Sequence, residues 1–439
     1  MEYVSELHMH SRFSRACSKD LTLKTLEKWA KIKGVSLLGT SDFTHPEWIK
    51  ELKSELKEDE EGIYRSATGF PFMLTSEVSL MYSQGDKGRR VHNLIFAPSF
   101  EVVDQITEYL KSKGRIDYDG RPIFKIPCPE FTEHMMQIDK NIEVIPAHAW
   151  TPWFGVFGSK SGFDSLKEAF QEQVKNIHAI ETGMSSNPAM NWRLSQLDNI
   201  SLVSFSDSHS FWPWRMGREA TIFDVKDLSY KAIINAIRTK KGLKETIEVD
   251  PGYGKYHVDG HRNCGVSFEP EESKKHKNLC PKCKRPLTIG VLNRVEQLAD
   301  RPLGYTPKDA IPFKTLIPLT ELIVAVSGGG LATQKTWAEY YNILRVGKSE
   351  LDVLLNATKE QLLMVTKEKI VEAILLNREG KLQVKPGFDG VYGVPVIPGI
   401  EPRPQVGDAP KPKEKNILKG GKISQEKKVK TQKGLGEYI

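Results

Sequence analysis

The chain has 439 residues, of which 39% are hydrophobic and 27% charged, with a formal net charge of +7. This length suffices for two or three domains, and the composition is that of an ordinary globular protein. No run of about 18 apolar residues occurs, which argues against a membrane span, and the first residues do not resemble a signal peptide. We therefore expect a cytoplasmic protein. Five cysteines, an odd number, argue against a disulfide framework.

The first half of the chain alternates between strand-like and helix-like segments. Short apolar runs typical of strands occur at residues 4–10, 35–40, 72–74, 94–96, 143–145, 177–180 and 202–205. Segments with helical spacing of apolar residues lie between them, near residues 20–34, 165–175 and 230–238. This alternation predicts an α/β fold with a parallel sheet or barrel, whose reactive groups lie at the carboxyl ends of the strands.

Histidines and carboxylates recur mostly at or just past the ends of these runs. They are His8, His10, Asp42, His45, Glu77, His92, His148, Asp207 and His209. His8 and His10 are two residues apart, so on a strand both side chains point to one face. A single buried histidine is more often a core residue than a ligand, but chance does not readily explain the whole set. Imidazoles and carboxylates that converge from several strands predict a site for more than one divalent metal, which activates water for attack on a phosphoester.

Large aromatic residues follow two of these candidate ligands. They are Trp150, Trp153 and Phe154 after one histidine, and Trp212 and Trp214 after another. Rings on strand-end loops suit stacking against nucleobases, at about 1–3 kcal/mol per base, and an enzyme that inspects one extruded base needs such a wall. The alternative is that these rings pack the mouth of a barrel. Three arginines near the ligands either clamp phosphate or are ordinary surface residues: Arg12, Arg15 and Arg218.

A second candidate metal site lies in the Gly-, His-, Cys- and Lys-rich segment that follows the first half. His261-x-x-Cys264 and Cys280-x-x-Cys283 supply four ligands on two short turns, the pattern of a tetrahedral structural zinc site. His257 is an alternative ligand. The neighbouring lysines are typical of contact with phosphates, and the two remaining cysteines are expected to be ordinary thiols.

The last part of the chain changes character twice. Residues 315–380 have leucines at helical spacing, and residues 401–439 form a low-complexity tail with ten basic and five acidic residues. The tail ends in a spacing that resembles a sliding-clamp (PCNA-interacting) peptide: Gln432, Leu435, Tyr438 and Ile439. The predicted domains are a phosphoesterase domain at 1–246, a zinc-binding ribbon at 247–300, a helical DNA-contacting domain at 301–400 and a flexible basic tail at 401–439.

The ordered series of histidines and carboxylates resembles that of the PHP (polymerase and histidinol phosphatase) family of metal-dependent phosphoesterases, over residues 1–245. The resemblance implies a distorted (β/α)7 barrel that holds two or three divalent metals, with Zn expected and Mn, Mg or Fe as alternatives. It makes Glu77 the bridging carboxylate. It also makes Asp207, Glu77 and His10 the residues that carry catalysis.

Two positions of the family pattern stay open in this chain. Phe43 follows Asp42 where the family usually has histidine, so either His45 substitutes for it or one metal position is weakened. The acidic ligand of the first motif is also unassigned, with Cys17 and Asp20 as the candidates.

A closer resemblance, over residues 1–400, is to the endonuclease Q family. It rests on the order of barrel, zinc ribbon and helical segment, and on the runs PLTIGV at 286–291 and RVEQLADR at 294–301. The resemblance implies hydrolysis of the phosphodiester 5′ to a deaminated base (hypoxanthine, uracil or xanthine) or an abasic site, with the base flipped into an aromatic pocket. Damaged DNA and a sliding clamp are the expected partners of a monomeric protein, and the clamp peptide suits an archaeal source. The alternatives are a small-molecule phosphatase and a non-catalytic DNA-binding adaptor.

Overall fold

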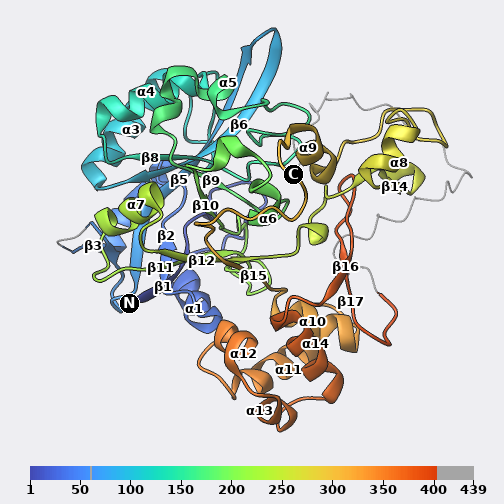
Figure 1. Ribbon diagram of the computed structural model, residues 1–439. Coiled ribbons are helices and arrows are strands. Elements are labelled where there is room, and N and C mark those ends of the chain that lie inside the picture. Colours follow the sequence, from blue (N-terminus) through green and yellow to red (C-terminus); the bar gives the residue numbers. More distant parts are fainter. Residues whose placement is uncertain (60–61, 403–439) are drawn as a thin grey trace, which may run out of the picture. The chain divides into compact units, whose positions relative to one another are not determined.

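The computed structural model describes residues 1–59 and 62–402, and Figure 1 shows their arrangement. The described residues belong to one compact unit, so the domain boundaries at residues 246 and 300 fall inside it and stay predictions. The predicted clamp peptide, at Gln432, Leu435, Tyr438 and Ile439, lies outside the described residues. None of the described helices is long and apolar enough to cross a membrane.

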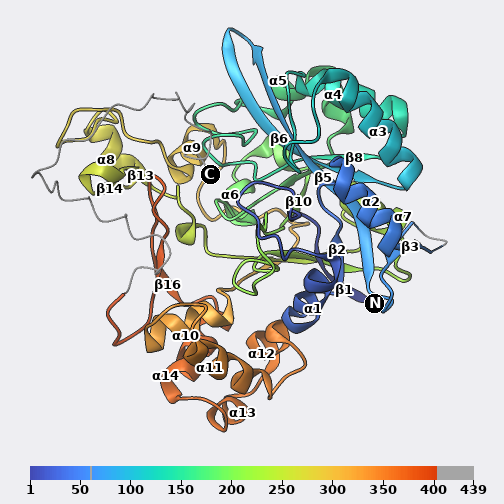
Figure 2. The ribbon, with the colours of Figure 1, turned by 180° about the vertical axis from the view of Figure 1, so that it is seen from behind.

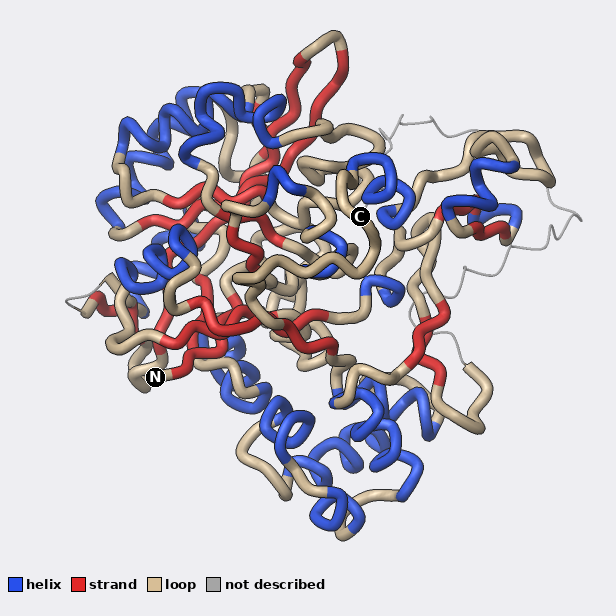
Figure 3. The backbone as a smooth tube through the Cα atoms, viewed as in Figure 1, coloured by secondary structure: helices blue, strands red, loops and turns tan. Residues whose placement is uncertain are grey.

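A mixed sheet of eleven strands takes ten strands from residues 2–248 and one, β15, from the later part of the chain (Figure 3). Its strands are β1 (Glu2–Glu6), β2 (Leu37–Gly39), β3 (Lys57–Glu58), β4 (Tyr64–Arg65), β5 (Pro71–Gln84), β6 (Lys87–Ala97), β7 (Ile123–Phe124), β8 (Glu143–Pro146), β11 (Ala220–Asp224), β12 (Leu243–Glu248) and β15 (Phe313–Thr315). β1, β2 and β5 are parallel neighbours, whereas β6, β8, β11 and β12 join through antiparallel pairs. β9 (Ala179–Glu181) and β10 (Ser201–Val203) form a separate parallel pair. The fold is therefore mixed α/β, and only part of the sheet has the expected parallel order.

The largest departure from the predicted strands is one long hairpin. The runs at 72–74 and 94–96 belong to β5 and β6, which pair antiparallel along their length and project from the sheet in Figures 1 and 2. Gly85 and Asp86 connect them with φ angles of 60° and 56°, the two positive values that a type I′ turn requires. Glu77 and His92 consequently lie within strands rather than at strand ends.

Helices flank the sheet, and several begin at polar N-caps. In the first half they are α1 (Leu23–Lys33), α2 (Pro46–Glu55), α3 (Phe100–Lys113), α4 (Cys128–Ile138), α5 (Leu166–Phe170), α6 (Pro188–Asn191) and α7 (Tyr230–Thr239). Thr22, Ser99 and Ser229 accept hydrogen bonds from backbone N–H groups in the first turns of α1, α3 and α7, each worth about 1 kcal/mol. The helices predicted near 20–34 and 230–238 are present, whereas α5 continues as a 3₁₀ helix at Gln171–Asn176.

The second half holds the cysteine-rich segment and a helical segment. The first contains β13 (Asp259–His261), β14 (Val266–Phe268), α8 (Pro270–Lys275) and α9 (Val291–Leu298). The second contains α10 (Leu319–Ser327), α11 (Gln334–Leu344), α12 (Glu350–Asn356), α13 (Lys359–Leu363) and α14 (Glu368–Arg378), followed by the paired strands β16 (Gln383–Lys385) and β17 (Val394–Val396). These helices share an apolar core of their own. β15 precedes them and pairs with β12, so the helical segment is tied to the sheet of the first half.

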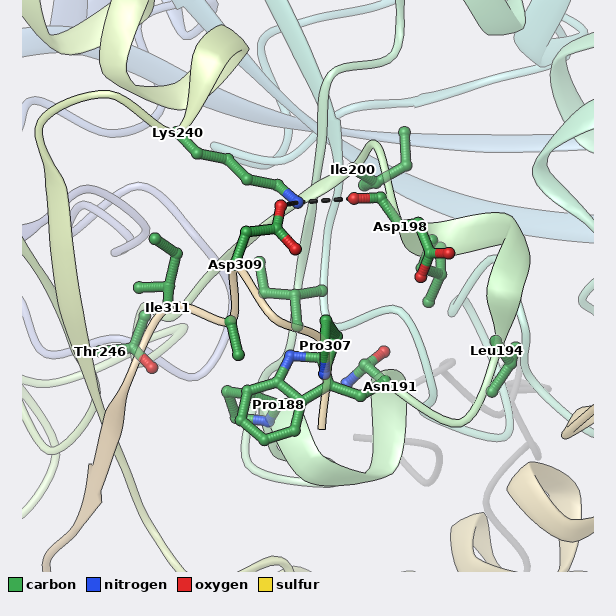
Figure 4. A pocket seen from close by; sticks show the side chains of 14 residues that line it. Pro188, Asn191, Leu194, Asp198, Ile200, Lys240, Thr246, Pro307, Asp309 and Ile311 are labelled. Carbon is green, nitrogen blue, oxygen red and sulfur yellow. Dashed lines mark hydrogen bonds and ion pairs between the residues drawn. The ribbon is translucent and has the colours of Figure 1, made fainter. Parts of the chain in front are cut away.

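A small cavity lies beside β12, under the segment that leads to β15 (Figure 4). Its volume is about 30 Å³. Lys240 Nζ donates to the carbonyl of Asp198 at 2.6 Å and lies 3.7 Å from Asp309 at its edge. A volume of this size holds about two waters, so the cavity suits solvent rather than a substrate. It shares no residue with the candidate metal ligands.

Candidate metal centre

Four side chains from distant parts of the sequence converge on one point. His8 and His10 follow β1, Glu77 lies in β5 and Asp207 follows β10; we call these four residues the first group. Their ligand atoms all lie within 4.8 Å of one another. His10 Nε2 is 3.1 Å from both Glu77 Oε2 and Asp207 Oδ1, and His8 Nε2 is 3.5 Å from the same two oxygens. This spacing suits four ligands around one small divalent ion.

A second group shares one residue with the first and consists of Glu77, His92 and His148. Glu77 Oε1 lies 2.7 Å from His92 Nδ1 and 3.3 Å from His148 Nε2, and the two ring nitrogens are 3.2 Å apart. One carboxylate thus turns each of its oxygens toward a different group, as a ligand that bridges two ions does. Six of the nine predicted ligands meet in these two groups.

Glu181 holds two of these ligands in place and is not among the residues predicted from the sequence. Its Oε1 lies 2.8 Å from His8 Nδ1, and its Oε2 accepts from the backbone N–H of His148 at 2.6 Å. Thr151 Oγ1 lies 2.9 Å from His148 Nδ1. Such contacts fix the tautomer and the orientation of an imidazole and leave its opposite nitrogen to a metal. Its position at the end of β9 is the sequence feature that could have identified it, because most of the predicted ligands also follow strand-like runs.

Three predicted ligands lie beside the two groups rather than in them. Asp42 Oδ1 is 3.0 Å from His10 Nδ1, on the side of the ring away from the first group, so it orients that ring. His45 is the N-cap of α2, where its Nδ1 accepts from the backbone N–H of Glu47 at 3.3 Å. The ring of His209 is tilted by 47° against that of His10, with centroids 4.3 Å apart. His45 is therefore not a member of either group, and His209 borders the first one.

Opposite charges dominate the electrostatics of the first group. Burial lowers the pKa of His8 and His10, but the carboxylates around them outweigh it and raise both pKa values well above the usual range. Burial raises the pKa of Glu77 and Asp207, but nearby histidines hold both well below their usual range, helped at Glu77 by the Arg121 guanidinium 3.1 Å away. The imidazoles and carboxylates of the first group therefore stabilise each other's charged forms.

Backbone strain collects at the ligands. Asp42, His148 and Asp207 have φ angles of 40°, 30° and 46°, in the left-handed region that non-glycine residues rarely adopt. Gly183 lies so close to His148 that a Cβ added to it would meet the Cβ of that histidine at 2.8 Å. Such conformations persist only where the surrounding structure holds them, and they cluster at functional sites. The positions of these side chains are therefore imposed by the fold.

The aromatic residues that follow His148 have different environments. Trp150 is fully buried and donates its indole N–H to Asn191 at 2.8 Å. It is a core residue with no face exposed to a base, contrary to the prediction that it contacts nucleic acid. Trp153 and Phe154 are half-buried, and the ring of Phe154 lies 4.4 Å from that of His92 in the second group. The part of this segment that lies at the metal centre is thus Phe154.

Residues 210–217, which we call the tryptophan loop, form an aromatic cluster with two helices. Trp212 and Trp214 stack with centroids 5.3 Å apart and planes inclined by 7°. The ring of Trp29 in α1 lies 5.3 Å from that of Trp212, and the ring of Trp337 in α11 lies 5.3 Å from Trp212 and 5.5 Å from Trp214. Trp214 is buried and Trp212 half-buried. The loop therefore joins the first half of the chain to the helical segment and leaves part of Trp212 accessible.

The three arginines predicted to contact phosphate differ in exposure. Arg12 and Arg15 are ion-paired with acidic neighbours, and their side chains are 31% and 52% exposed. Arg218 is buried and donates to the carbonyl of Ser206 at 3.2 Å. Arg218 therefore stabilises the backbone next to Asp207. Because its side chain is buried, the structure does not support its predicted role in binding phosphate at the surface.

The cysteine-rich segment, which we call the ribbon segment from here on, holds a further set of side chains with metal-ligand spacing. We call this set the zinc group: His261, Cys264, Cys280 and Cys283. Burial opposes ionisation of Cys280, but the backbone N–H groups of Cys283 and Lys282 outweigh it and lower its pKa to about 6. A thiolate at neutral pH is what Zn²⁺ requires. His257, the alternative ligand, lies outside the group. The set with His261 is the one that fits.

A Glu181→Gln variant should bind divalent metal about 10–100-fold more weakly than the wild type, because the amide loses the charge that orients His8 and one of the two acceptor oxygens. Titration of the metal-stripped protein with Zn²⁺ or Mn²⁺ measures this effect. The exposed Glu172→Gln serves as the matched control. An unchanged affinity in Glu181→Gln would show that this carboxylate does not support the ligands.

The residues of the first and second groups fit divalent ions by their own chemistry. His8 Nε2 is buried, has no hydrogen-bond partner among the described residues and faces Glu77 and Asp207. Imidazole and carboxylate ligands in this mixture suit Zn, Mn or Fe. Two ions that share a carboxylate are an arrangement used for phosphoester hydrolysis. The fold and the site define a metal-dependent phosphodiesterase.

Two solved structures are similar to this chain over most of its length. The lesion-specific endonuclease of Pyrococcus furiosus has a TM-score of 0.81 and 32% identity, over 91% of this chain and 96% of that chain. Endonuclease Q in complex with a 27-mer duplex has a TM-score of 0.82 and 32% identity, over 91% and 97%. The chain belongs to the endonuclease Q family.

Two uncharacterised proteins are similar in sequence. A protein of Methanocaldococcus jannaschii is 34% identical over 254 residues, which are 56% of this chain but 31% of that protein, so the match spans about a third of that relative. YqxK of Bacillus subtilis is 29% identical over 393 residues, 86% of this chain and 92% of YqxK. No protein-family model matches the chain.

Proposed function

We propose that this protein is a DNA repair endonuclease that hydrolyses the phosphodiester bond 5′ to a deaminated base (hypoxanthine, uracil or xanthine) or to an abasic site. The observation that carries the proposal is that Glu77 is shared by two ligand groups in a chain of the endonuclease Q family. The relative solved with DNA holds a duplex whose abasic lesion lies at the active site, which supports damaged DNA as the substrate here.

The metals of the proposal are two or three divalent ions in the first and second groups, with Zn expected and Mn, Mg or Fe as alternatives, and one structural Zn in the zinc group. When bound, such ions would supply an activated water and neutralise charge on the phosphoryl oxygens. Glu77 would be shared between the ions, and His10 and Asp207 would be the other catalytic residues, both as ligands of the first group. Arg121, 3.1 Å from Glu77 and 14% exposed, adds a positive charge beside the same carboxylate.

The flipped base of the proposal would stack on the half-buried rings beside the second group. Phe154 lies against His92, and the guanidinium of Arg90 lies 5.8 Å from the Phe154 ring. Phe154 has a φ of 69°, which is rare for a bulky residue. Trp153 and Trp212 are the other half-buried rings of the predicted set. Rings of this kind favour a base that has left the duplex.

A nicking assay tests the proposal directly. Otherwise identical duplexes that carry hypoxanthine, uracil, an abasic site or no lesion are incubated with the full chain, with and without a chelator. We expect one nick, 5′ to the lesion, that the chelator abolishes. Equal cleavage of all duplexes, or of none, would reject the assignment.

A small-molecule phosphatase is the alternative function. It accounts for the first and second groups but not for the zinc group and the helical segment, which a small substrate does not need. Hydrolysis of p-nitrophenyl phosphate in the absence of lesion cleavage would favour this alternative. We expect cleavage of the lesion-containing duplexes and little hydrolysis of p-nitrophenyl phosphate.

An Asp207→Ala variant should lose cleavage while keeping its fold. Asp207 Oδ1 faces both His8 and His10, and its side chain is 32% exposed, so its removal opens no large cavity in the core. Nicking rates and far-UV circular dichroism measure the two parts of this prediction. The exposed Asp227→Ala is the control and should behave as the wild type. Wild-type nicking by Asp207→Ala would refute the site.

The tail of the chain, which lies outside the described residues, leads to a further prediction. Deletion of residues 432–439 should spare nicking and abolish binding to a sliding clamp, because Leu435, Tyr438 and Ile439 would form the apolar plug of the motif. Surface plasmon resonance against an immobilised clamp measures the affinity, with Lys433→Ala as the matched control. Unchanged clamp affinity after the deletion would reject the motif.

The domain organisation is part of the proposal. Residues 1–246 would form the distorted (β/α)7 barrel, 247–300 the zinc ribbon and 301–400 the helical DNA-contacting domain of a monomer. The ribbon and helical segments each contain an apolar cluster, while Val291 and Val295 pack with the first half and Tyr253 packs with the helices.

A further inference from the structure

The last residue of α1, Lys33, is buried together with the carboxylate that it binds. Its Nζ lies 2.7 Å from Glu350 Oε1 in α12, and the two side chains are 1% and 0% exposed. Lysine is almost never fully buried unless it is paired, and a buried ion pair often contributes no more stability than apolar residues of similar size. The other hydrogen bonds of the pair indicate what it holds in place.

The pair connects several distant segments. Lys33 Nζ also donates to the carbonyl of Pro213 at 2.8 Å. Glu350 accepts from the backbone N–H of Leu319 at 3.0 Å and from the hydroxyl of Tyr340 at 2.7 Å. One amino group and one carboxylate thus join α1, α10, α11 and α12 to the middle of the tryptophan loop.

Pro213 separates the two residues whose rings stack in this loop. The indoles of Trp212 and Trp214 lie nearly parallel, and Trp337 packs against both. The hydrogen bond from Lys33 therefore fixes the peptide between the two stacked tryptophans. This is the part of the loop that carries the half-buried Trp212.

The backbone just before the tryptophan loop and the last residue of the loop are held independently. Glu6 accepts from the backbone N–H of Ser206 at 3.2 Å and from that of Gly217 at 3.1 Å. Asp207 adjoins the first of these anchors. Loss of the Lys33 contact would therefore loosen the centre of the loop and leave the backbone beside Asp207 in place.

We propose that Lys33 and Glu350 are positioning residues through which the helical segment holds the Trp212–Trp214 stack in place for a lesion. This inference rests on the proposed function, which counts the half-buried Trp212 among the rings for a flipped base, while the buried Trp214 supports it from behind. It separates binding from chemistry, because the contact reaches the tryptophans and not the ligands of the first group. Lesion affinity should therefore depend on the pair, whereas metal content should not.

Two variants of Lys33 distinguish positioning from simple stabilisation. Lys33→Met keeps an unbranched side chain of similar length but leaves the carboxylate of Glu350 without its cation, which lowers the stability of the protein. In Lys33→Met/Glu350→Gln the charge imbalance is gone, and the glutamine still offers an oxygen to Leu319 N–H and an amide to Tyr340. The double variant should regain stability but not the hydrogen bond to Pro213. Lys31→Met, which breaks a pair with Glu27 on the same helix, is the matched control.

The measurements are thermal unfolding, the exciton band of the stacked tryptophans in circular dichroism, metal content, and the Kd for a duplex that carries hypoxanthine, in the presence of chelator. We expect both Lys33 variants to lose the exciton band and to bind the duplex about tenfold more weakly, which corresponds to about one stacked base. Metal content should match the wild type, and the control should be unchanged in every measurement.

A double variant that regains the wild-type melting temperature and also keeps the exciton band and the DNA affinity would overturn the proposal. The circular dichroism measurement needs no DNA. A wild-type protein that fails to cut lesions would therefore reject the proposed function, while the exciton band would still report whether Lys33 holds the loop.

Discussion

Replacing Glu77 with glutamine should lower the rate of lesion cleavage by more than about 100-fold and reduce the metal content of the centre. A residue that only orients a ligand contributes about 10–100-fold, and Glu77 itself belongs to both the first and the second group. The amide has one oxygen, whereas each group uses one carboxylate oxygen. Single-turnover nicking and elemental analysis of the purified variant measure the two effects.

The stability of this variant needs to be measured as well. Arg121 lies 3.1 Å from Glu77 and loses its partner in Glu77→Gln, and an unpaired, largely buried charge destabilises a protein. Glu47→Gln, which alters an exposed carboxylate paired with Lys50, is the matched control and should retain full activity. A folded Glu77→Gln protein with wild-type metal content and cleavage would contradict a shared carboxylate.

The second large effect is expected at the zinc group, where Cys280→Ser should release one zinc per chain and unfold the ribbon segment. The apolar core of this segment consists of Val266, Cys280 and Leu287, with two partly buried neighbours, which is too small to support a fold alone. A structural zinc contributes about 10–16 kcal/mol of apparent binding free energy at neutral pH. Elemental analysis and limited proteolysis within residues 262–288 measure the loss.

Cys17→Ser is the control for this experiment, because Cys17 is a half-buried free thiol outside the zinc group. It should keep both the zinc and the resistance of the ribbon segment to proteolysis. A Cys280→Ser protein with full zinc content and an uncut ribbon would show that the group is not a zinc site.

Much of the first group could be predicted from local pattern. The alternation of His8 and His10 places both rings on one face of an extended chain, and Asp207 follows a short apolar strand. Such positions need no knowledge of distant contacts. The four ligands of the zinc group were likewise predicted by their spacing along the chain.

The supporting residues could not be predicted in the same way. Glu181 and Arg121 act through contacts with His8, His148 and Glu77, which are 33 to 173 residues away in the sequence. The roles of Trp150 and Arg218 depend on which way a loop residue points. Proximity to a ligand in the sequence favoured the site for both, whereas the packing of the loops turns both side chains inward.

The long hairpin also has a consequence for how this sequence can change in length. Glu77 stands opposite Leu94, and Ser79 stands opposite His92. The predicted ligands Glu77 and His92 therefore share one face of the β5–β6 hairpin. A single residue inserted in one strand between the ligands and the turn would rotate one of them to the other face. Residues added in matched pairs at Gly85 and Asp86 would only extend the tip. Among homologues, insertions and deletions in the β5–β6 hairpin should therefore contain an even number of residues and lie at its tip.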